Sequence, residues 1–145
     1  MYKSILIPTD GSQLAVKAVK EGVALAKEIG AKVTVLTVTM PFYAFGLDSW
    51  TPEDTEPAYD ARMRDYANKI LASGAEAART AGVPCHTIHI VHEYPYQAII
   101  DAAASNGCDL ILMASHGRRG LAAVVLGSET LKVLTHSKIP VLVHR

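Results

Sequence analysis

The feature that most constrains the fold is a regular alternation between short runs rich in β-branched residues and longer runs with helical apolar spacing. Strands are predicted at Ser4–Thr9, Lys32–Thr39, Cys85–Val91, Leu110–Ser115 and Val141–His144, and helices at Gln13–Ile29, Pro57–Ala81, Tyr94–Ser105 and Ser128–His136. Strands that alternate with helices at this spacing are connected by right-handed crossovers. The pattern therefore predicts an α/β fold whose mostly parallel sheet is covered by helices on both faces.

Length and charge limit the classes of protein to which the chain can belong. Its 145 residues fit one domain, residues 1–145, and half of them are hydrophobic, which is enough for a proper core. Lys and Arg total 14, as do Asp and Glu, so no basic field favours nucleic-acid binding. No apolar run approaches the about 20 residues of a membrane span, and no secretory leader opens the chain. We expect a cytoplasmic protein that binds neither nucleic acid nor membranes.

The two cysteines, Cys85 and Cys108, have neither zinc nor disulfide spacing. Each lies in or beside a predicted strand, and we expect both to be buried free thiols. Three histidines recur near the third predicted strand, but His86 and His89 should point to opposite faces of it. The sequence therefore predicts no metal site. We also find no pair of residues that would form a catalytic acid and base.

Open parallel sheets bind ligands beyond the carboxyl ends of their strands. The most informative loop there follows the fourth predicted strand and contains Gly117, Gly120 and Gly127 before the helix that starts at Ser128. Glycine lets backbone N–H groups approach a phosphate closely, and a helix N-terminus adds unpaired donors. A turn with an ordinary Ser128 cap explains the same residues, so both interpretations stay open. Neither a P-loop motif nor a dinucleotide-binding glycine motif is present.

Three segments of the chain resemble the universal stress protein family in its nucleotide-binding branch. The signature of that branch runs G-x-x-G, nine residues, then G-[ST], and Gly117, Gly127 and Ser128 match it. The opening segment 8–12 and the closing segment 138–143 also match, so the resemblance covers the whole chain. One departure is Ala114, which stands where the signature has its first glycine.

The resemblance implies a five-stranded parallel sheet in the order 3-2-1-4-5 and an adenine-nucleotide site at its carboxyl edge. In that site Asp10 and the backbone of Pro8 and Thr9 would lie beside the adenosine, and the Val38 backbone would line the adenine slot. Met113 would close the floor of the pocket. The phosphates would be wrapped by the remaining positions, which are Ala114, Gly117, Gly127, Ser128 and Thr130. The ligand would be ATP or AMP, and a magnesium ion held mainly by phosphates and water can accompany ATP.

The resemblance also implies a homodimer that pairs the last strand across a two-fold axis through Val141 and Val143. The implied function is a stress-response regulator that acts through an unidentified protein partner. Two alternatives remain open. Because Ala114 replaces a signature glycine, the chain could be a dimeric interaction module that binds no nucleotide. Slow ATP hydrolysis is the other, and the absence of a catalytic constellation ranks it last.

Overall fold

The computed structural model describes residues 1–44, 55–117 and 126–145, and it shows strands and helices in strict alternation. The strands are β1 (Ser4–Pro8), β2 (Lys32–Thr39), β3 (Cys85–Val91), β4 (Leu110–Ala114) and β5 (Val141–His144). The helices are α1 (Gln13–Ile29), α2 (Glu56–Ala81), α3 (Pro95–Ser105) and α4 (Ser128–His136), with a short 3-10 helix η1 (Phe42–Ala44) after β2. Every predicted strand and helix is present, and each boundary agrees to within one residue.

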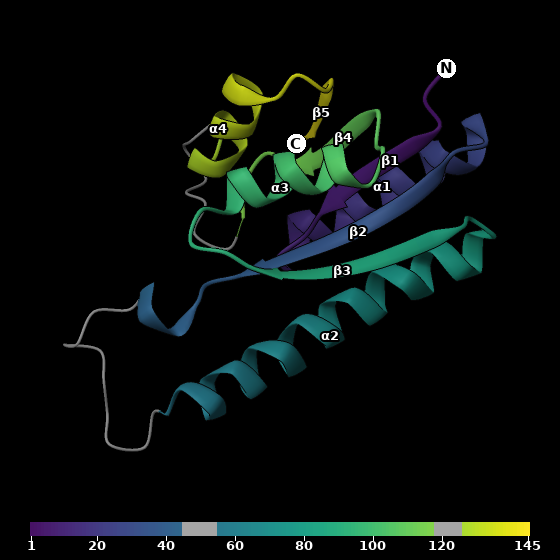
Figure 1. The fold of residues 1–145 in the computed structure, drawn as a ribbon. Coiled ribbons are helices and arrows are strands. Elements are labelled where there is room, and N and C mark those ends of the chain that lie inside the picture. The colour runs from purple at the N-terminus through teal and green to yellow at the C-terminus, as the bar shows by residue number, and fades with distance from the viewer. Residues whose placement is uncertain (45–54, 118–125) are drawn as a thin grey trace.

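The strands form one five-stranded sheet in the order β3-β2-β1-β4-β5, and every pair is parallel. Both the fold class and the strand order are thereby confirmed. The order changes direction at β1, which pairs with β2 on one side and with β4 on the other. In Figure 1 the carboxyl ends of β1 and β2 point to the left, toward the first turns of α2 and α4. This is the edge at which such sheets bind ligands.

Two hydrophobic clusters cover the two faces of the sheet. The first lies between α1 and the sheet and includes Ile5, Ile7 and Leu112 of the strands. The second joins α3 and α4 to the opposite face through residues such as Leu6, Ile111 and Val133. Side chains alternate between faces along each strand, so consecutive strand residues divide between the clusters. Figure 1 shows the resulting layers, with α3 and α4 on one side of the sheet and α2 on the other.

The helix ends have the expected caps. The Ser12 hydroxyl accepts a hydrogen bond from the Ala15 amide at 3.3 Å and caps α1. Gly30 and Gly82 end α1 and α2 with φ values of 70° and 73°, in the left-handed region where glycine carries no steric cost. Pro95 occupies the first turn of α3, where its missing N–H is not needed.

One prediction about the core was wrong. Cys108 is buried, as expected, and the Ser4 hydroxyl donates to its sulfur at 3.6 Å. Cys85 is exposed. The reason is the sheet order, which places β3 at an edge, where its first residues lack a second neighbouring strand. An apolar strand run thus does not guarantee burial at each of its positions.

In the parts of the chain that the structure describes, none of the helices combines the length and the apolar composition of a membrane span.

Candidate functional site

The end of β1 forms a rigid platform at the carboxyl edge of the sheet. The Thr9 amide donates to the Leu36 carbonyl at 2.8 Å, which extends the pairing with β2 one residue past the strand. The buried Thr37 hydroxyl donates to the Thr9 carbonyl at 3.1 Å. Pro8 and Thr9 are themselves buried. The backbone that leads into the first loop is therefore held by hydrogen bonds from the neighbouring strand.

Asp10 follows this platform and is held on two sides. Its Oδ1 accepts the Ser12 amide at 3.0 Å, which braces the turn that leads into α1. Its backbone carbonyl accepts the Tyr66 hydroxyl of α2 at 3.1 Å. Asp10 thus braces its own turn through Oδ1.

The second oxygen of Asp10 lies against Gly117 in the loop after β4. A Cβ atom built on Gly117 would lie 2.5 Å from Asp10 Oδ2, closer than real Cβ atoms come, so the Asp10 carboxylate would have to shift to admit it. The φ of Gly117 is not positive, so the glycine serves the close approach of the Asp10 carboxylate and not the backbone conformation. The loops after β1 and β4 therefore meet at the point where the strand order changes direction.

The start of α4 closes the other side of this loop. The Gly127 amide donates to the Ser115 carbonyl at 2.6 Å, so the chain returns almost to the point at which it left β4. Thr130 is buried, and its hydroxyl donates to the Ala114 carbonyl at 3.0 Å. Ser128 is exposed in the first turn of the helix. The two hydroxyls thus differ, because Thr130 ties the helix to β4 whereas Ser128 lies at the surface.

Ala114 occupies an ordinary strand position at the end of β4, where it pairs with His144 of β5. No residue other than glycine has a positive φ in the described parts of the chain, so Ala114 is under no backbone strain. Its side chain belongs to the cluster beneath α1 and is 6% exposed. The methyl group that Ala114 carries in place of the signature glycine's hydrogen is thus packed in the core.

Val38 and Met113 direct their side chains away from the loops. Both belong to the cluster on the α3 and α4 face, and Met113 is only 6% exposed. Val38 is the last residue but one of β2, so its backbone lies near the carboxyl edge. A ligand at that edge would meet the Val38 backbone and the apolar layer beneath it. Arg118, Arg119 and Gly120 lie outside the described residues.

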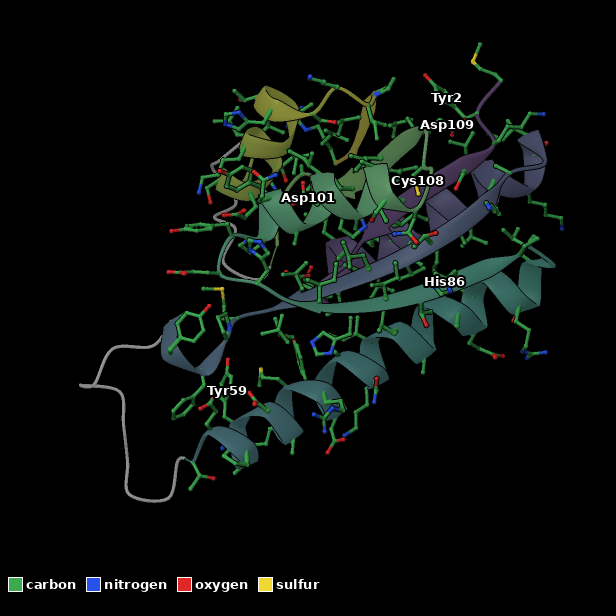
Figure 2. All side chains as sticks on the ribbon, viewed as in Figure 1. Tyr2, Tyr59, His86, Asp101, Cys108 and Asp109 are labelled. Carbon is green, nitrogen blue, oxygen red and sulfur yellow. The ribbon has the colours of Figure 1, made fainter. Side chains whose placement is uncertain are left out.

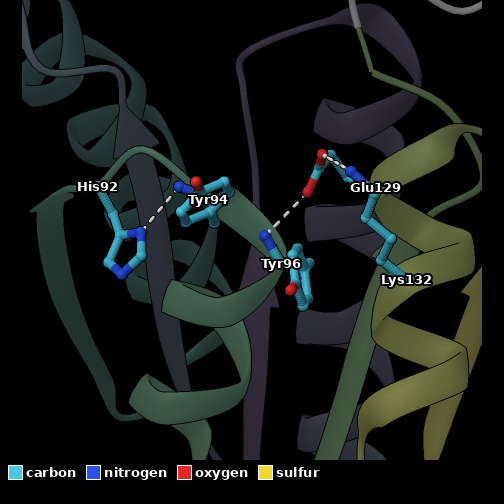
Figure 3. Close-up of polar contacts among 5 residues, drawn as sticks. All are labelled: His92, Tyr94, Tyr96, Glu129 and Lys132. Carbon is cyan, nitrogen blue, oxygen red and sulfur yellow. Dashed lines mark hydrogen bonds and ion pairs between the residues drawn. The ribbon is translucent and has the colours of Figure 1, made fainter. Parts of the chain in front are cut away.

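Glu129 was not predicted as a functional residue from the sequence, and it links α4 to α3 (Figure 3). Its Oε2 accepts the Tyr96 amide in the first turn of α3 at 2.9 Å, and its Oε1 lies 3.3 Å from the Lys132 ammonium. A carboxylate in the first turn of a helix is a familiar signal. The cross-helix contact spans 33 residues, however, and nothing in the local sequence indicates it.

Two tyrosines of α2 were missed in the same way. Tyr66 donates to the Asp10 carbonyl, and the Tyr59 hydroxyl donates to the Met40 carbonyl at 2.6 Å. Tyr59 and Tyr66 are seven residues apart, two helical turns, and so share one face of α2. Burial raises the pKa of the Tyr59 hydroxyl, and the nearby Asp60 charge adds to the effect. Through these contacts α2 reaches the loops after both β1 and β2.

The three histidines near β3 have separate surroundings. His89 Nε2 lies 2.7 Å from the Thr39 hydroxyl, and burial lowers its pKa, with the positive charge of Arg64 as a second cause. His92 Nδ1 accepts the Tyr94 amide at 2.8 Å (Figure 3), whereas His86 is exposed. Among the residues that the structure describes, no group of three or more His, Cys, Asp or Glu side chains could hold a metal ion.

Comparison with known proteins identifies the family. A sequence model described as the universal stress protein family matches residues 1–145. The solved structure of the hypothetical protein MJ0577, from Methanocaldococcus jannaschii, superposes with a TM-score of 0.82 at 31% identity, over 99% of this chain and 96% of that one. Two further structures are a universal stress protein in complex with cAMP and the Archaeoglobus fulgidus protein in complex with dAMP.

The two complexes are similar to this chain mainly in fold. The cAMP complex has a TM-score of 0.75 at 24% identity and covers 99% of this chain and 97% of its own. The dAMP complex has a TM-score of 0.70 at 20% identity, with 99% and 98% covered. The match of the family model over the full 145 residues, joined to the strand order and the signature glycines, establishes that this chain belongs to the universal stress protein family.

Proposed function

We propose that this chain binds an adenine nucleotide in the crevice between Asp10 and the loop that runs from Gly117 to Ser128. The observation that carries the proposal is the close approach of Asp10 Oδ2 to Gly117, where an added Cβ atom would displace the carboxylate. A carboxylate beside a glycine backbone can accept a ribose hydroxyl while the loop amides face phosphates. The Pro8 and Thr9 backbone and the Val38 backbone complete the adenosine side.

The phosphates would lie against the loop and the first turn of α4. Gly127 brings the chain back to β4, and the exposed Ser128 hydroxyl and the unpaired amides of that turn are suitable donors. Thr130 would support the phosphate site from the core side, because its hydroxyl donates to the Ala114 carbonyl and so holds the first turn of α4 against β4. The ligand would be ATP or AMP. Magnesium would accompany ATP through phosphate oxygens and water, and the described residues add no carboxylate cluster for it.

The ligands of two relatives support this choice. One universal stress protein was solved with cAMP and another with dAMP, and both are adenine nucleotides. Their sequence identities of 24% and 20% are low, so the argument for this chain depends on its own loop geometry. We further propose that the protein is a cytoplasmic stress-response regulator that acts as a homodimer through β5 and signals to a protein partner.

A second candidate function is a dimeric interaction module that binds no nucleotide. The observation that favours it is Ala114, which replaces a signature glycine. The packing of its methyl group in the core beneath α1 weighs against this alternative, because the substitution removes no loop amide from the crevice.

Titration calorimetry with ATP and with AMP on the dialysed protein tests the proposal. We expect measurable heat for at least one nucleotide. Asp10→Ala should weaken the affinity for that nucleotide about tenfold or more, because a hydrogen bond to a charged group is lost. Asp101→Ala, on the exposed face of α3, is the control and should bind as the wild type does. No heat with either nucleotide, and none released on denaturation of freshly purified protein, would favour the interaction module. Slow ADP formation that Asp10→Ala abolishes would favour an ATPase.

A further inference from the structure

Helices α1 and α2 enclose a groove on the face of the sheet opposite α3 and α4. Its volume is about 340 Å³, at the small end of the range for small-molecule sites. Thr9 and Gly11 lie at one end of it, beside the Asp10 loop. The residues used below all line the groove, and they are Val19, Lys20, Lys69, Ile70, Gly74 and Ala77.

Small residues of α2 line the groove. Gly74 lines it and lets α2 sit low on the sheet, since a Cβ there would lie 3.0 Å from Val35 Cγ1. Ala77, one turn further along, leaves space that a larger side chain would fill. Val19 is 4% exposed and belongs to the core. The inner part of the groove is therefore apolar and set by tightly packed neighbours.

The outer part of the groove is positively charged. Lys20 comes from α1 and Lys69 from α2, and both are exposed. Within the described ranges neither lysine makes an ion pair. A lysine ammonium keeps its charge at neutral pH and binds a carboxylate or a phosphate readily. The walls thus favour an apolar chain, and the entrance favours an anion.

We propose that this groove binds a small amphipathic carboxylate. Its hydrocarbon chain would lie along Val19, Ile70 and Ala77, and its carboxylate would lie at the entrance beside Lys20 and Lys69. The volume suits a medium-length alkyl chain and excludes a helix or strand of a partner protein. The two lysine ammoniums at the entrance repel the like charge of an amphipathic amine and so disfavour it. Of the residues named for the nucleotide crevice, Thr9 also lines this groove, but the proposal does not depend on the proposed function.

Octanoate is the probe, used without nucleotide so that a failure here is independent of nucleotide binding. Amide chemical-shift titration should show saturable binding of one octanoate, with shifts on the facing sides of α1 and α2. Octanol should bind more weakly, and octylammonium more weakly still. Added salt should weaken octanoate binding and leave octanol unaffected, because only the carboxylate depends on screened charge.

Two variants test the two halves of the groove. Lys20→Gln with Lys69→Gln should weaken octanoate about fivefold at low salt, in line with exposed ion pairs, and leave octanol binding unchanged. Ala77→Leu should abolish binding of both by filling the apolar part. Lys17→Gln, also exposed on α1 but outside the groove, should bind as the wild type does. Absence of saturable binding, equal affinity for octanoate and octylammonium, or wild-type binding by the lysine double variant would overturn the proposal.

Discussion

At the scale of single residues, the most informative contacts join positions that are distant in sequence. Asp109 accepts the backbone amides of Lys3 and Ser4 at 2.9 and 3.0 Å, more than 100 residues away. Figure 2 shows Asp109 near Tyr2, at the opposite edge of the sheet from the candidate site. Partial burial by itself would raise the pKa of Asp109, but the amide hydrogen bonds from Ser4 and Lys3 outweigh it and hold the pKa below its ordinary value.

This contact predicts a pH-dependent loss of stability. A carboxyl whose pKa is lowered on folding stabilises the protein above its unfolded pKa of about 3.9, and that stabilisation disappears as the pH falls through the folded value. Asp109→Asn should lower the free energy of unfolding by about 1 kcal/mol at pH 7. The difference from the wild type should shrink toward zero near pH 2. Urea unfolding across this range, with Asp101→Asn as an exposed control, provides the measurement. A difference that stays constant with pH would contradict the assignment.

Residue-scale prediction from sequence succeeded where the reason was local and failed where it was not. The ends of α1 and α2 depend on neighbouring residues such as Ser12, Gly30 and Gly82, and both helices were predicted to within one residue. The exposure of Cys85 depends on which strands lie at the sheet edges, which no local pattern contains. Tyr66 and Glu129 were missed for the same reason, since their partners are 56 and 33 residues away.

At the scale of elements, nearly the whole secondary structure could be predicted from hydrophobic periodicity and helix-end signals. Long amphipathic helices such as α2 and β-branched strands such as β2 carry strong local patterns. The pairing of the strands could not be predicted in this way, because the alternation predicts a parallel sheet but leaves its strand order open. The order came from the family resemblance. Two strands, β3 and β5, turn out to be edges.

The edge at β5 supports a prediction about assembly. Val141 and Val143 are partly buried and Leu142 is 43% exposed. Among the strands that the structure describes, none pairs with the outer edge of β5. Unpaired strand edges associate readily. If two copies pair here, Val141→Asp with Val143→Asp should halve the mass measured by light scattering, because charge is buried at the interface.

The assembly experiment needs a check on folding, since Val141 also contacts the core. Circular dichroism of the double variant provides it, and Val141→Thr with Val143→Thr is the milder pair that should raise the dimer dissociation constant. Leu131→Asp, exposed on α4, should leave the mass unchanged. A folded double aspartate variant with the wild-type mass would exclude β5 as the interface.

At the scale of the whole molecule, the strand order decides where a site can form. Because β1 pairs with both β2 and β4, the loops that follow β1 and β4 meet, although Asp10 and Gly117 are more than 100 residues apart in sequence. Both residues were named as candidates from the sequence, but their contact could not be derived from their spacing. The contact follows from the sheet topology, and the nucleotide-binding proposal depends on it.

A double-mutant cycle between Asp10 and Gly117, measured by calorimetric titration with ATP and AMP, tests that centre most directly. A methyl group on Gly117 would displace the Asp10 carboxylate, so Gly117→Ala should weaken nucleotide binding about tenfold in the wild-type background. In the Asp10→Ala background the methyl group has no carboxylate to displace, and Gly117→Ala should change affinity less than about twofold. Gly107→Ala, at a positive φ with open space around it, should lower stability and leave affinity unchanged. The proposed crevice would be contradicted if the losses of binding free energy at Asp10 and Gly117 simply add in the double variant, or if neither single variant loses affinity.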